Sequence, residues 1–387
     1  FTVRGVTITA SRAPFTFGVV TGVNASGVSV AFNASAYPFP GDIPWLATAP
    51  HVYGAINETS FLPRLPMLWR GGGAITLTSP SALYMEASGM PPAIVGHHVV
   101  LEHSRSHTAF SLTHVRDVVF ANVTLESNPG FGFYLVRCHN VDFSDTRIVP
   151  PDGRPMSTMA DGIHLRLCSG DVLFRGVVVE RNGDDCIALH NGYHAITGFP
   201  DAGDRSVVTV AAVEPLDVVA GEPWGARHGA DLGLLSDSLT VTSADFAGKR
   251  LRFSAPLPAS IDVGDVLTSL TRPSTVVVAG ATLWGNLGHG IRIKVPDVVV
   301  EDSIIGGNSF MPVLMLPDAS FWMSSLAVRN VTLRNNTLHA GGVWADAQYD
   351  VDATSVTVTA YAGEAHGAPV AASDCVNSDV RLVSNTI

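Results

Sequence analysis

The sequence has few charged residues, almost no lysine and few cysteines. Charged residues make up 15% of the 387 positions, and lysine occurs only at Lys249 and Lys294. The net charge of −11 argues against a nucleic-acid partner, which would need a basic surface. The four cysteines form no CxxC pair and no His/Cys cluster has zinc spacing, so neither a metal site nor a cofactor is expected. No apolar run approaches the roughly 18 residues that cross a bilayer, so no membrane span is expected.

The sequence also lacks a signal peptide. This indicates a mature or trimmed chain, and the start at Phe1 inside a repeat predicts that earlier coils or a cap precede it. Six N-x-S/T sequons suit a secreted or periplasmic glycoprotein, but three of them lie in a repeat that favours Asn for its backbone conformation. Both explanations of the sequons stay open. The sequons are at Asn24, Asn33, Asn57, Asn122, Asn330 and Asn335.

Short apolar runs recur through most of the chain. A nine-residue pattern (Asp/Asn, Val, variable, Phe/Val/Leu, variable, Asn/Asp/Gly, two variable, Leu/Ile/Val) occurs at 117–125 and 140–148. Repeated short strands at a period of roughly 20 to 25 residues predict an all-β, right-handed parallel β-helix, with a β-sandwich as the alternative. The Asn/Asp/Gly position predicts a bend. The pattern also starts at Asp171, Thr275, Asp297, Asn330 and Asp379, fits Phe1 to Ile8, and fits His98 to Glu102 and Ser355 to Thr359 loosely.

A second short strand recurs in each predicted coil as a triplet. Its first and third residues are expected to face the core and its middle residue to face outward. Equivalent positions on successive coils of a parallel stack lie about 4.8 Å apart, so the residues two before each triplet form a column. The triplets start at Phe110, Phe133, Ile163, Ile187, Ile291 and Leu314, and the column contains Thr108, Phe131, Asp161, Asp185, His289 and Pro312.

Two stretches break this period and predict inserted antiparallel β modules resembling small barrels. The expected organisation is a first coil at 1–12, a first module at 13–95, coils with the site at 96–194, a second module at 195–272 and C-terminal coils at 273–387.

Three carboxylates fall on two adjacent predicted coils. Asp161 and Asp185 share a register 24 residues apart, and Asp184 is displaced by one position. Crowding is expected to raise the pKa of at least one of them, which would provide the acid for glycoside hydrolysis. Two carboxylates sharing a water, with the acid about 6.5–9.5 Å away, would give inversion. Asp184 is the expected general acid, since Asp161 and Asp185 stack and can hold the water.

Other chemistries fit the same residues. Clustered carboxylates also suit calcium, and a calcium-dependent lyase would use Arg292 or Lys294 as its basic group. A non-catalytic glycan-binding face is a further alternative. The predicted substrate contacts are His164, His190, His289, Arg292, Lys294 and Tyr134, with Phe131 and Trp322 as further aromatic candidates.

Two cysteines occupy equivalent places on adjacent predicted coils. Cys138 and Cys168 each follow the third triplet position by three residues. Their stacking predicts either a disulfide or a pair of buried free thiols. Cys186 and Cys375 have no expected role.

The residues around these carboxylates resemble two related families. Asp161-Gly162 and Gly183-Asp184-Asp185-Cys186, with Gly288-His289-Gly290-Ile291, are similar to the polygalacturonases of glycoside hydrolase family 28, and Arg292-Ile293-Lys294 resembles their substrate-carboxylate motif. A wider resemblance is to the α-1,3-galactosidases of glycoside hydrolase family 110. It includes 157–164, the double Asp followed by His190, 128–133, 298–302 and 330–336.

The family 110 resemblance implies a β-helix with two inserted β-barrel modules. It implies inverting removal of terminal α-linked galactose without a metal, with Asp161, Asp184 and Asp185 as the acid and base residues. The expected partner is therefore a carbohydrate substrate. A polygalacturonase-like hydrolase or lyase acting on uronic-acid polysaccharide is the alternative.

Overall fold

The computed structural model describes most of the chain. The described residues are 1–39, 51–57, 60–61, 68–69, 74–86, 94–103, 107–201, 203–212, 218–319, 322–325, 328–339, 355–358 and 377–387. In 51–57, 60–61 and 68–69, and at 212 and 325, only the backbone is described. Cys375 and the side chain of Asn57 lie outside these residues. Within the described part, no helix is long and apolar enough to cross a membrane.

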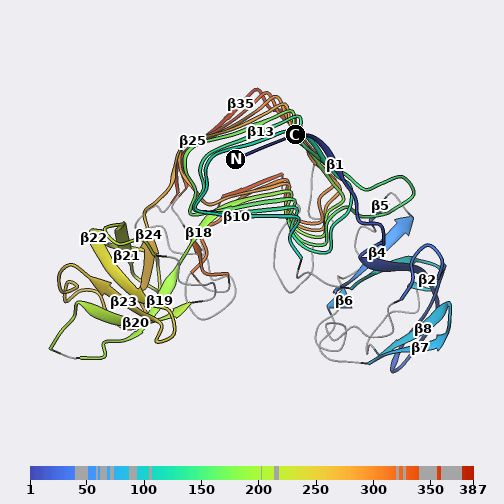
Figure 1. Cartoon of the computed structure of the whole chain (residues 1–387), viewed down its shortest axis with the longest axis horizontal. Helices are drawn as coiled ribbons and strands as arrows, with labels where there is room; N and C mark the ends of the chain where they lie inside the picture. Colours follow the sequence, from blue (N-terminus) through green and yellow to red (C-terminus); the bar gives the residue numbers. More distant parts are fainter. Residues whose placement is uncertain are drawn as a thin grey trace.

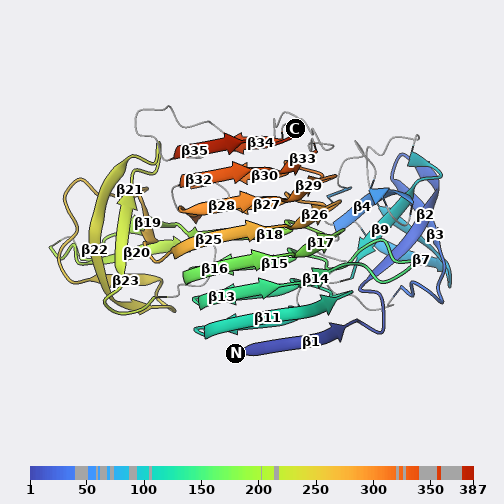
Figure 2. The same ribbon diagram turned by 90° about the horizontal axis from the view of Figure 1, so that it is seen from above.

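Parallel strands stack into coils that share three faces, which confirms the predicted β-helix (Figures 1 and 2). The first face contains β1 (Thr2–Ile8), β11 (Arg116–Leu125), β13 (His139–Ser144), β16 (Ser169–Arg175), β25 (Pro273–Ala279), β28 (Val298–Glu301), β32 (Arg329–Arg334) and β35 (Ser378–Val383). The second contains the end of β11, then β14 (Arg147–Ile148), β17 (Val178–Glu180), β26 (Thr282–Trp284), β29 (Ile304–Gly306) and β33 (Thr337–Leu338). The third contains β10 (Phe110–Thr113), β12 (Phe133–Val136), β15 (Ile163–Arg166), β18 (Ile187–Gly192), β27 (Ile291–Ile293), β30 (Val313–Met315) and β34 (Val356–Val358).

The repeat encodes both the core and the corners of the coils. Phe120, Phe143 and Phe174 are buried and stack in succession, with ring centroids 5.1 and 5.4 Å apart. The predicted bends are confirmed, because the Asn/Asp/Gly positions have positive φ, as at Asn122 (53°) and Gly176 (61°). Asn, Asp and Gly tolerate this left-handed conformation better than other residues, which is why the repeat selects them.

For three segments, the position in the fold predicted from the repeat is wrong. β9 (His98–Glu102) pairs antiparallel with module strands, so it is not a coil. Val356–Val358 lies on the third face beside β30 and not on the first face. The last triplet is shifted by one residue, because Ile291 pairs with Val313 and not with Leu314. Val313 and Met315 therefore face the core, since a one-residue slip exchanges the faces of a strand.

The first module is an eight-stranded antiparallel sheet between β1 and β10. It packs on the coils through a cluster that includes Phe15, Tyr37, Met159 and Leu287. Its strands are β2 (Phe15–Asn24), β3 (Gly27–Phe32), β4 (His51–Asn57), β5 (Ser60–Phe61), β6 (Leu68–Trp69), β7 (Ile75–Ser79), β8 (Ala82–Glu86) and β9.

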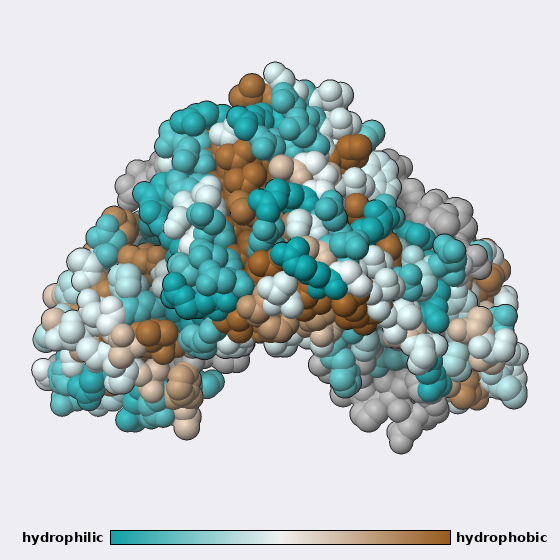
Figure 3. All heavy atoms as spheres, turned by 45° about the horizontal axis from the view of Figure 1, so that its top comes forward, coloured by the Kyte–Doolittle hydropathy of each residue, from teal (hydrophilic) through white to brown (hydrophobic). Residues whose placement is uncertain are grey.

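The second module is a closed barrel that follows β18 directly. A buried ion pair fastens it to the coils: Arg137 Nη1 and Nη2 donate to Glu222 Oε1 and Oε2 at 2.7 and 2.9 Å. The two modules project to the same side of the third face, one at each end, and appear as two lobes with a hollow between them (Figures 1 and 3). The barrel strands are β19 (His194–Gly198), β20 (Val207–Ala212), β21 (Pro223–Arg227), β22 (Leu234–Asp245), β23 (Arg250–Phe253) and β24 (Val266–Ser269).

The cysteine pair does not form a disulfide. Cys138 and Cys168 do stack on adjacent coils, since Ser169 N donates to Cys138 O at 2.9 Å, but both are buried free thiols. Of the two predicted alternatives, the free thiols are therefore correct. A hydrogen bond from Cys168 lowers the pKa of Cys138, whereas burial raises the pKa of Cys168 well above its usual value. Cys186 is also a buried free thiol.

Candidate active site

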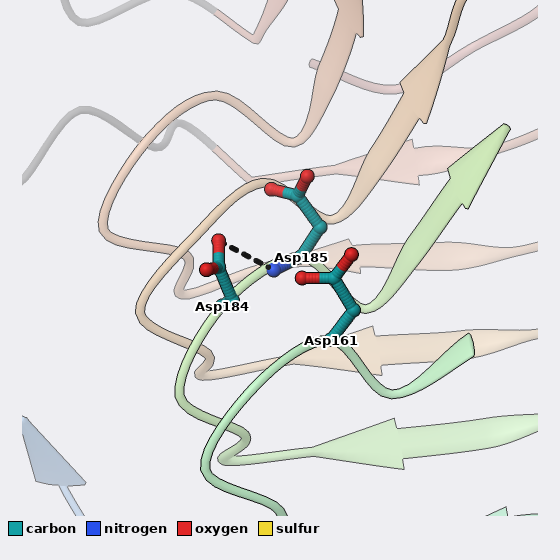
Figure 4. A group of neighbouring side chains, drawn as sticks. All are labelled: Asp161, Asp184 and Asp185. Atoms are coloured by element: carbon teal, nitrogen blue, oxygen red, sulfur yellow. Dashed lines mark hydrogen bonds between the residues drawn. The ribbon is translucent and has the colours of Figure 1, made fainter. Parts of the chain in front are cut away.

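Three aspartates meet at the turns that precede β15 and β18 (Figure 4). One carboxylate oxygen from each of Asp161, Asp184 and Asp185 lies within 4.8 Å of the others. Gly162 N donates to Asp185 O at 2.9 Å, and Ile163 pairs with Ile187, so Asp161 stacks on Asp185 as predicted. The carboxylate oxygens are closer together than the 6.5–9.5 Å expected between the acid and base of an inverting enzyme.

Asp185 is buried and surrounded by donors. Its Oδ1 accepts from the backbone N of His289 at 2.9 Å and lies 2.7 Å from His289 Nδ1. Its Oδ2 accepts from Arg292 Nη1 at 3.1 Å. His289 precedes β27 and Arg292 lies within it, so the next coil supplies all three donors.

These donors control the ionisation of Asp185. Burial alone would raise its pKa, but the charges of His289 and Arg292, together with the hydrogen bonds from His289, outweigh burial. The pKa of Asp185 is therefore held well below its usual range. Asp185 is therefore ionised, so the raised pKa expected for at least one of the three aspartates is not found at this residue.

Asp161 belongs to a buried chain that also includes His164 and His190. Nδ1 of His190 lies 2.7 Å from Asn191 O, which can only accept, so this nitrogen carries a hydrogen. Burial, followed by the charge of His164, lowers the pKa of His190 well below its usual value, so its Nε2 is an acceptor. Nε2 of His164, 2.8 Å away, must then donate. One further proton lies in the 2.6 Å contact between His164 Nδ1 and Asp161 Oδ2.

Asp184 is the least enclosed of the three aspartates. It is half-buried, and its Oδ1 accepts from the backbone N of Asp185 at 3.2 Å. The side chain of Asn286 donates to its backbone carbonyl. Its side chain is therefore the most accessible to solvent of the three.

Aromatic side chains surround the polar group. Phe131 and Tyr134 lie 5.2 and 5.0 Å from the ring of His164, and Phe310 stacks on His289 at 5.2 Å. Trp322 lies 5.8 Å from the guanidinium of Arg292 and is 51% exposed. The expected aromatic candidates Phe131, Tyr134 and Trp322 therefore gather at this site, and Trp322 is the exposed one among them.

Three of the predicted substrate contacts, Lys294, His164 and His190, are buried, although His164 was expected to face outward as the middle residue of its triplet. Lys294 is completely buried and bonds to Ser324 in β31 (Ser324–Ser325), a short strand that pairs antiparallel with the end of β18. His164 and His190 are 8% and 7% exposed. The coil repeat carries no information about a segment that folds back across the third face, which explains why Lys294 was expected to be accessible to substrate.

A column of asparagines, buried at Asn182 and Asn286 and half-buried at Asn128, supports the turns and was not recognised from the sequence. Asn182 Nδ2 donates to the carbonyls of both Asp184 and Asp185 at 2.8 Å. Asn286 Nδ2 donates to His289 O at 2.8 Å, and Asn128 Nδ2 donates to Phe131 O at 2.8 Å. Each Asn lies three residues before a member of the predicted column. This spacing is the feature of the sequence from which the supporting asparagines could have been found.

A glycine permits the close approach of two turns at the site. A Cβ on Gly288 would lie 2.5 Å from Asp184 C and from Asp185 N. Any larger residue would displace the peptide that joins the two aspartates.

Among the described residues, the three aspartates are also the candidate site for a metal ion. Calcium takes six to eight oxygen ligands, and both oxygens of Asp185 already accept hydrogen bonds. The Arg292 guanidinium beside them opposes a further positive charge. The arrangement therefore fits proton transfer better than calcium.

Comparisons with known proteins point to glycoside hydrolases. The family described as glycosyl hydrolases family 28 matches residues 97–199. Alpha-1,3-galactosidase B of Bacteroides thetaiotaomicron is 27% identical over 279 residues, covering 68% of this chain and 43% of the relative. Alpha-1,3-galactosidase A of Shewanella woodyi is 22% identical over 247 residues, covering 62% and 40%. The resemblance to the α-1,3-galactosidases is confirmed. The chain spans less than half the length of these relatives.

Solved structures show weaker likeness. The periplasmic alginate epimerase AlgG matches with a TM-score of 0.32 and 10% identity, over 72% of this chain and 48% of that chain. The catalytic domain of a GH87 alpha-1,3-glucanase in complex with nigerose matches with a TM-score of 0.22 and 9% identity, over 97% and 95%.

Proposed function

We propose that this chain is a glycoside hydrolase that removes terminal α-linked galactose, with Asp161, Asp184 and Asp185 as its catalytic residues. The single observation that carries the proposal is the convergence of three carboxylates, one held ionised by Arg292 and His289 and one sharing a proton with His164. Glycoside hydrolysis needs an ionised carboxylate near the water and a separate proton donor, and Asp184 is the third carboxylate, left for the second role. Similarity to α-1,3-galactosidases supports galactose as the sugar and α-1,3 as the linkage.

In this proposal a water lies between Asp161 and Asp185, and Asp184 protonates the leaving oxygen. Asp184 is the most accessible of the three, whereas Asp161 and Asp185 are enclosed by His164, His289 and Arg292. As the water attacks the anomeric carbon, its proton passes to the Asp161–Asp185 pair, and the glycosidic oxygen takes the proton of Asp184. Attack on the face opposite to the leaving group inverts the anomeric carbon. Because the carboxylates lie closer together than in most inverting enzymes, the anomer released needs direct measurement by proton NMR.

The polygalacturonase alternative depends on a substrate carboxylate meeting Arg292 and Lys294. Arg292 is committed to Asp185, and Lys294 is buried beneath β31. Neither group therefore offers a free charge to a uronate, which favours a neutral terminal sugar.

The deciding experiment measures sugar release from α-1,3-galactobiose and polygalacturonate in parallel. Galactose released from the first substrate alone, and lost in an Asp161/Asp184/Asp185→Asn variant, is the expected result. Cleavage of polygalacturonate would contradict the proposal, and loss of that cleavage on chelation would identify a calcium-dependent lyase. If neither substrate is cleaved, a glycan-binding role is favoured, and a glycan array would then test it.

We also propose that the protein acts outside the cytoplasm as a glycoprotein, from its sequons. Asn24 and Asn33 occupy exposed turns of the first module, where their side chains accept backbone hydrogen bonds. Asn122, Asn330 and Asn335 occupy left-handed bends of the coils, so conformation alone accounts for those three. Treatment with a glycosidase specific for N-linked glycans, followed by mass measurement of the protein from its native source, tests this.

A further inference from the structure

A cavity of about 280 Å³ lies at the junction between the barrel and the stacked coils. The barrel contributes Arg227 from β21, Ser236 from β22 and Thr268 from β24, while Arg272 and Arg329 come from the coil side. Tyr193, in the link from β18 to β19, completes the lining. The three aspartates of the proposed active site are not part of this lining, so the cavity is a separate place on the molecule.

Positive charge is concentrated in the cavity although the chain as a whole is acidic. Three of its lining residues are arginines in a protein of net charge −11, and Asp237 is the acidic residue among them. Arg227 is half-buried and uses Nη1 to bind Leu232 O at 3.0 Å, which leaves further donors on its guanidinium. Within the described part of the chain, the only ion-pair partner of Arg272 is Asp297, at 3.9 Å. Arg329 has no ion pair among the described residues. Arginine binds a carboxylate through two parallel hydrogen bonds, so this lining suits an acid group.

The remaining lining residues suit a sugar ring. Ser236, Thr268 and Asp237 offer hydroxyl and carboxylate oxygens, and Leu270 and Pro296 offer apolar contact. The hydroxyl of Tyr193 is buried and has no hydrogen-bond partner among the described residues. Burial raises the pKa of Tyr193 to about 12, so the phenol keeps its proton and remains a donor. Small-molecule pockets usually measure about 300–1,000 Å³, so this cavity suits one monosaccharide unit rather than a long segment.

We infer that this cavity is a second carbohydrate site that binds a sugar unit bearing a carboxylate, with the acid group on Arg227 and Arg329. This goes beyond the proposed hydrolase, whose sugar is neutral. A glycan that carries both a terminal galactose and an acidic sugar would meet the protein at two places. Holding the acidic unit would raise the effective concentration of the galactose at the aspartates.

The test is titration of the intact chain with galacturonate, glucuronate and N-acetylneuraminate, followed by ligand-observed NMR. Binding of at least one acidic sugar at about 10 mM or below is expected, and it should survive added galactose. Arg329→Gln and Arg227→Gln should each weaken it by about tenfold or more, since each removes a charged hydrogen bond. Arg329 is exposed, so its substitution leaves the fold intact even if Arg227→Gln disturbs the Leu232 contact. Arg250→Gln, on the exposed barrel surface, is the matched control.

The outcomes that overturn the inference are distinct from failure of the hydrolase proposal. Unchanged affinity in both cavity variants would place the ligand elsewhere. Loss of affinity in Arg292→Gln but not in Arg329→Gln would place the acidic sugar at the aspartates. Sulfate binding as tightly as every acidic sugar would reduce the cavity to a simple anion site. Absence of binding by all three sugars would reject it, whatever the galactosidase assay shows.

Discussion

Nη1 of Arg292 lies 3.1 Å from Oδ2 of Asp185, although 107 positions separate the two residues in the sequence. The whole barrel module lies between them along the chain, yet they occupy adjacent coils, because Ala188 of β18 pairs with Arg292 of β27. The parallel stacking of coils brings the two residues together, while the inserted barrel projects from the β-helix. The contact also fixes the charge of Asp185, since Arg292 favours the ionised carboxylate.

Replacing Arg292 by Gln is expected to move the acidic limb of the pH profile of kcat/KM to higher pH. The arginine lowers the pKa of Asp185, so its removal raises that pKa, and the carboxylate then protonates at a higher pH as the solution is acidified. The measurement is kcat/KM against pH for both proteins. Arg175→Gln, an exposed arginine paired with Asp142, should leave the limb unchanged. An unshifted limb in Arg292→Gln would show that ionisation of Asp185 does not limit activity.

Asp184→Asn and Asp161→Asn are expected to respond differently to the leaving group. Without its acid, the Asp184 variant should lose about 10²–10⁴ of kcat on a disaccharide but much less on α-galactosyl fluoride, whose leaving group needs no protonation. Without a ligand for the water, the Asp161 variant should be slow on both substrates. Asp171→Asn, at an exposed position of β16, is the control. The opposite pattern would make the Asp161–His164 pair the proton donor and leave Asp184 a supporting role.

Gly288→Ala should reduce activity by about 10² while the protein stays folded. The added Cβ would lie 2.5 Å from the peptide that joins Asp184 to Asp185, so this turn must shift, and displacements near 1 Å at reacting groups have effects of this size. The comparison is kcat alongside the circular dichroism spectrum. Gly22→Ala in the first module, where the nearest atom lies 4.0 Å away, should behave as the parent. Full activity in Gly288→Ala would mean that the turn is free to move.

Arg137→Met should destabilise the protein by about 3–5 kcal/mol, because it leaves the carboxylate of Glu222 buried without its cation. Denaturant unfolding measures the change, and proteolysis within 194–269 shows whether the barrel loosens first. Arg334→Gln, which breaks the more exposed pair with Glu301, should cost less than about 1 kcal/mol. The Arg137→Met/Glu222→Met double variant should recover part of the loss. If Arg137→Met costs no more than Arg334→Gln, the pair does not hold the barrel in place.

The fold was largely predictable because a β-helix repeats its own local rules. Each coil needs alternating apolar residues and αL-tolerant corners, and both occur in the sequence at a readable period, as Phe120, Phe143 and Asn122 show. One error falls where a strand fits two patterns. His98–Glu102 alternates like a coil but pairs with the module, and only long-range hydrogen bonds decide between the two.

The stacking of Asp161 on Asp185 follows from the sequence alone, since a fixed period in a parallel stack places equivalent residues one strand spacing apart. The sequence likewise determined the coils, the two inserted modules and the column that contains His289. Tertiary structure alone decided the chemistry of these groups: that Asp185 is held ionised, that Lys294 is buried beneath β31, and that Arg227 and Arg329 line one cavity. The reason is physical. Strand register is a local, repeating property, whereas the burial and the charge state of a side chain depend on which non-repeating segments pack against the coils.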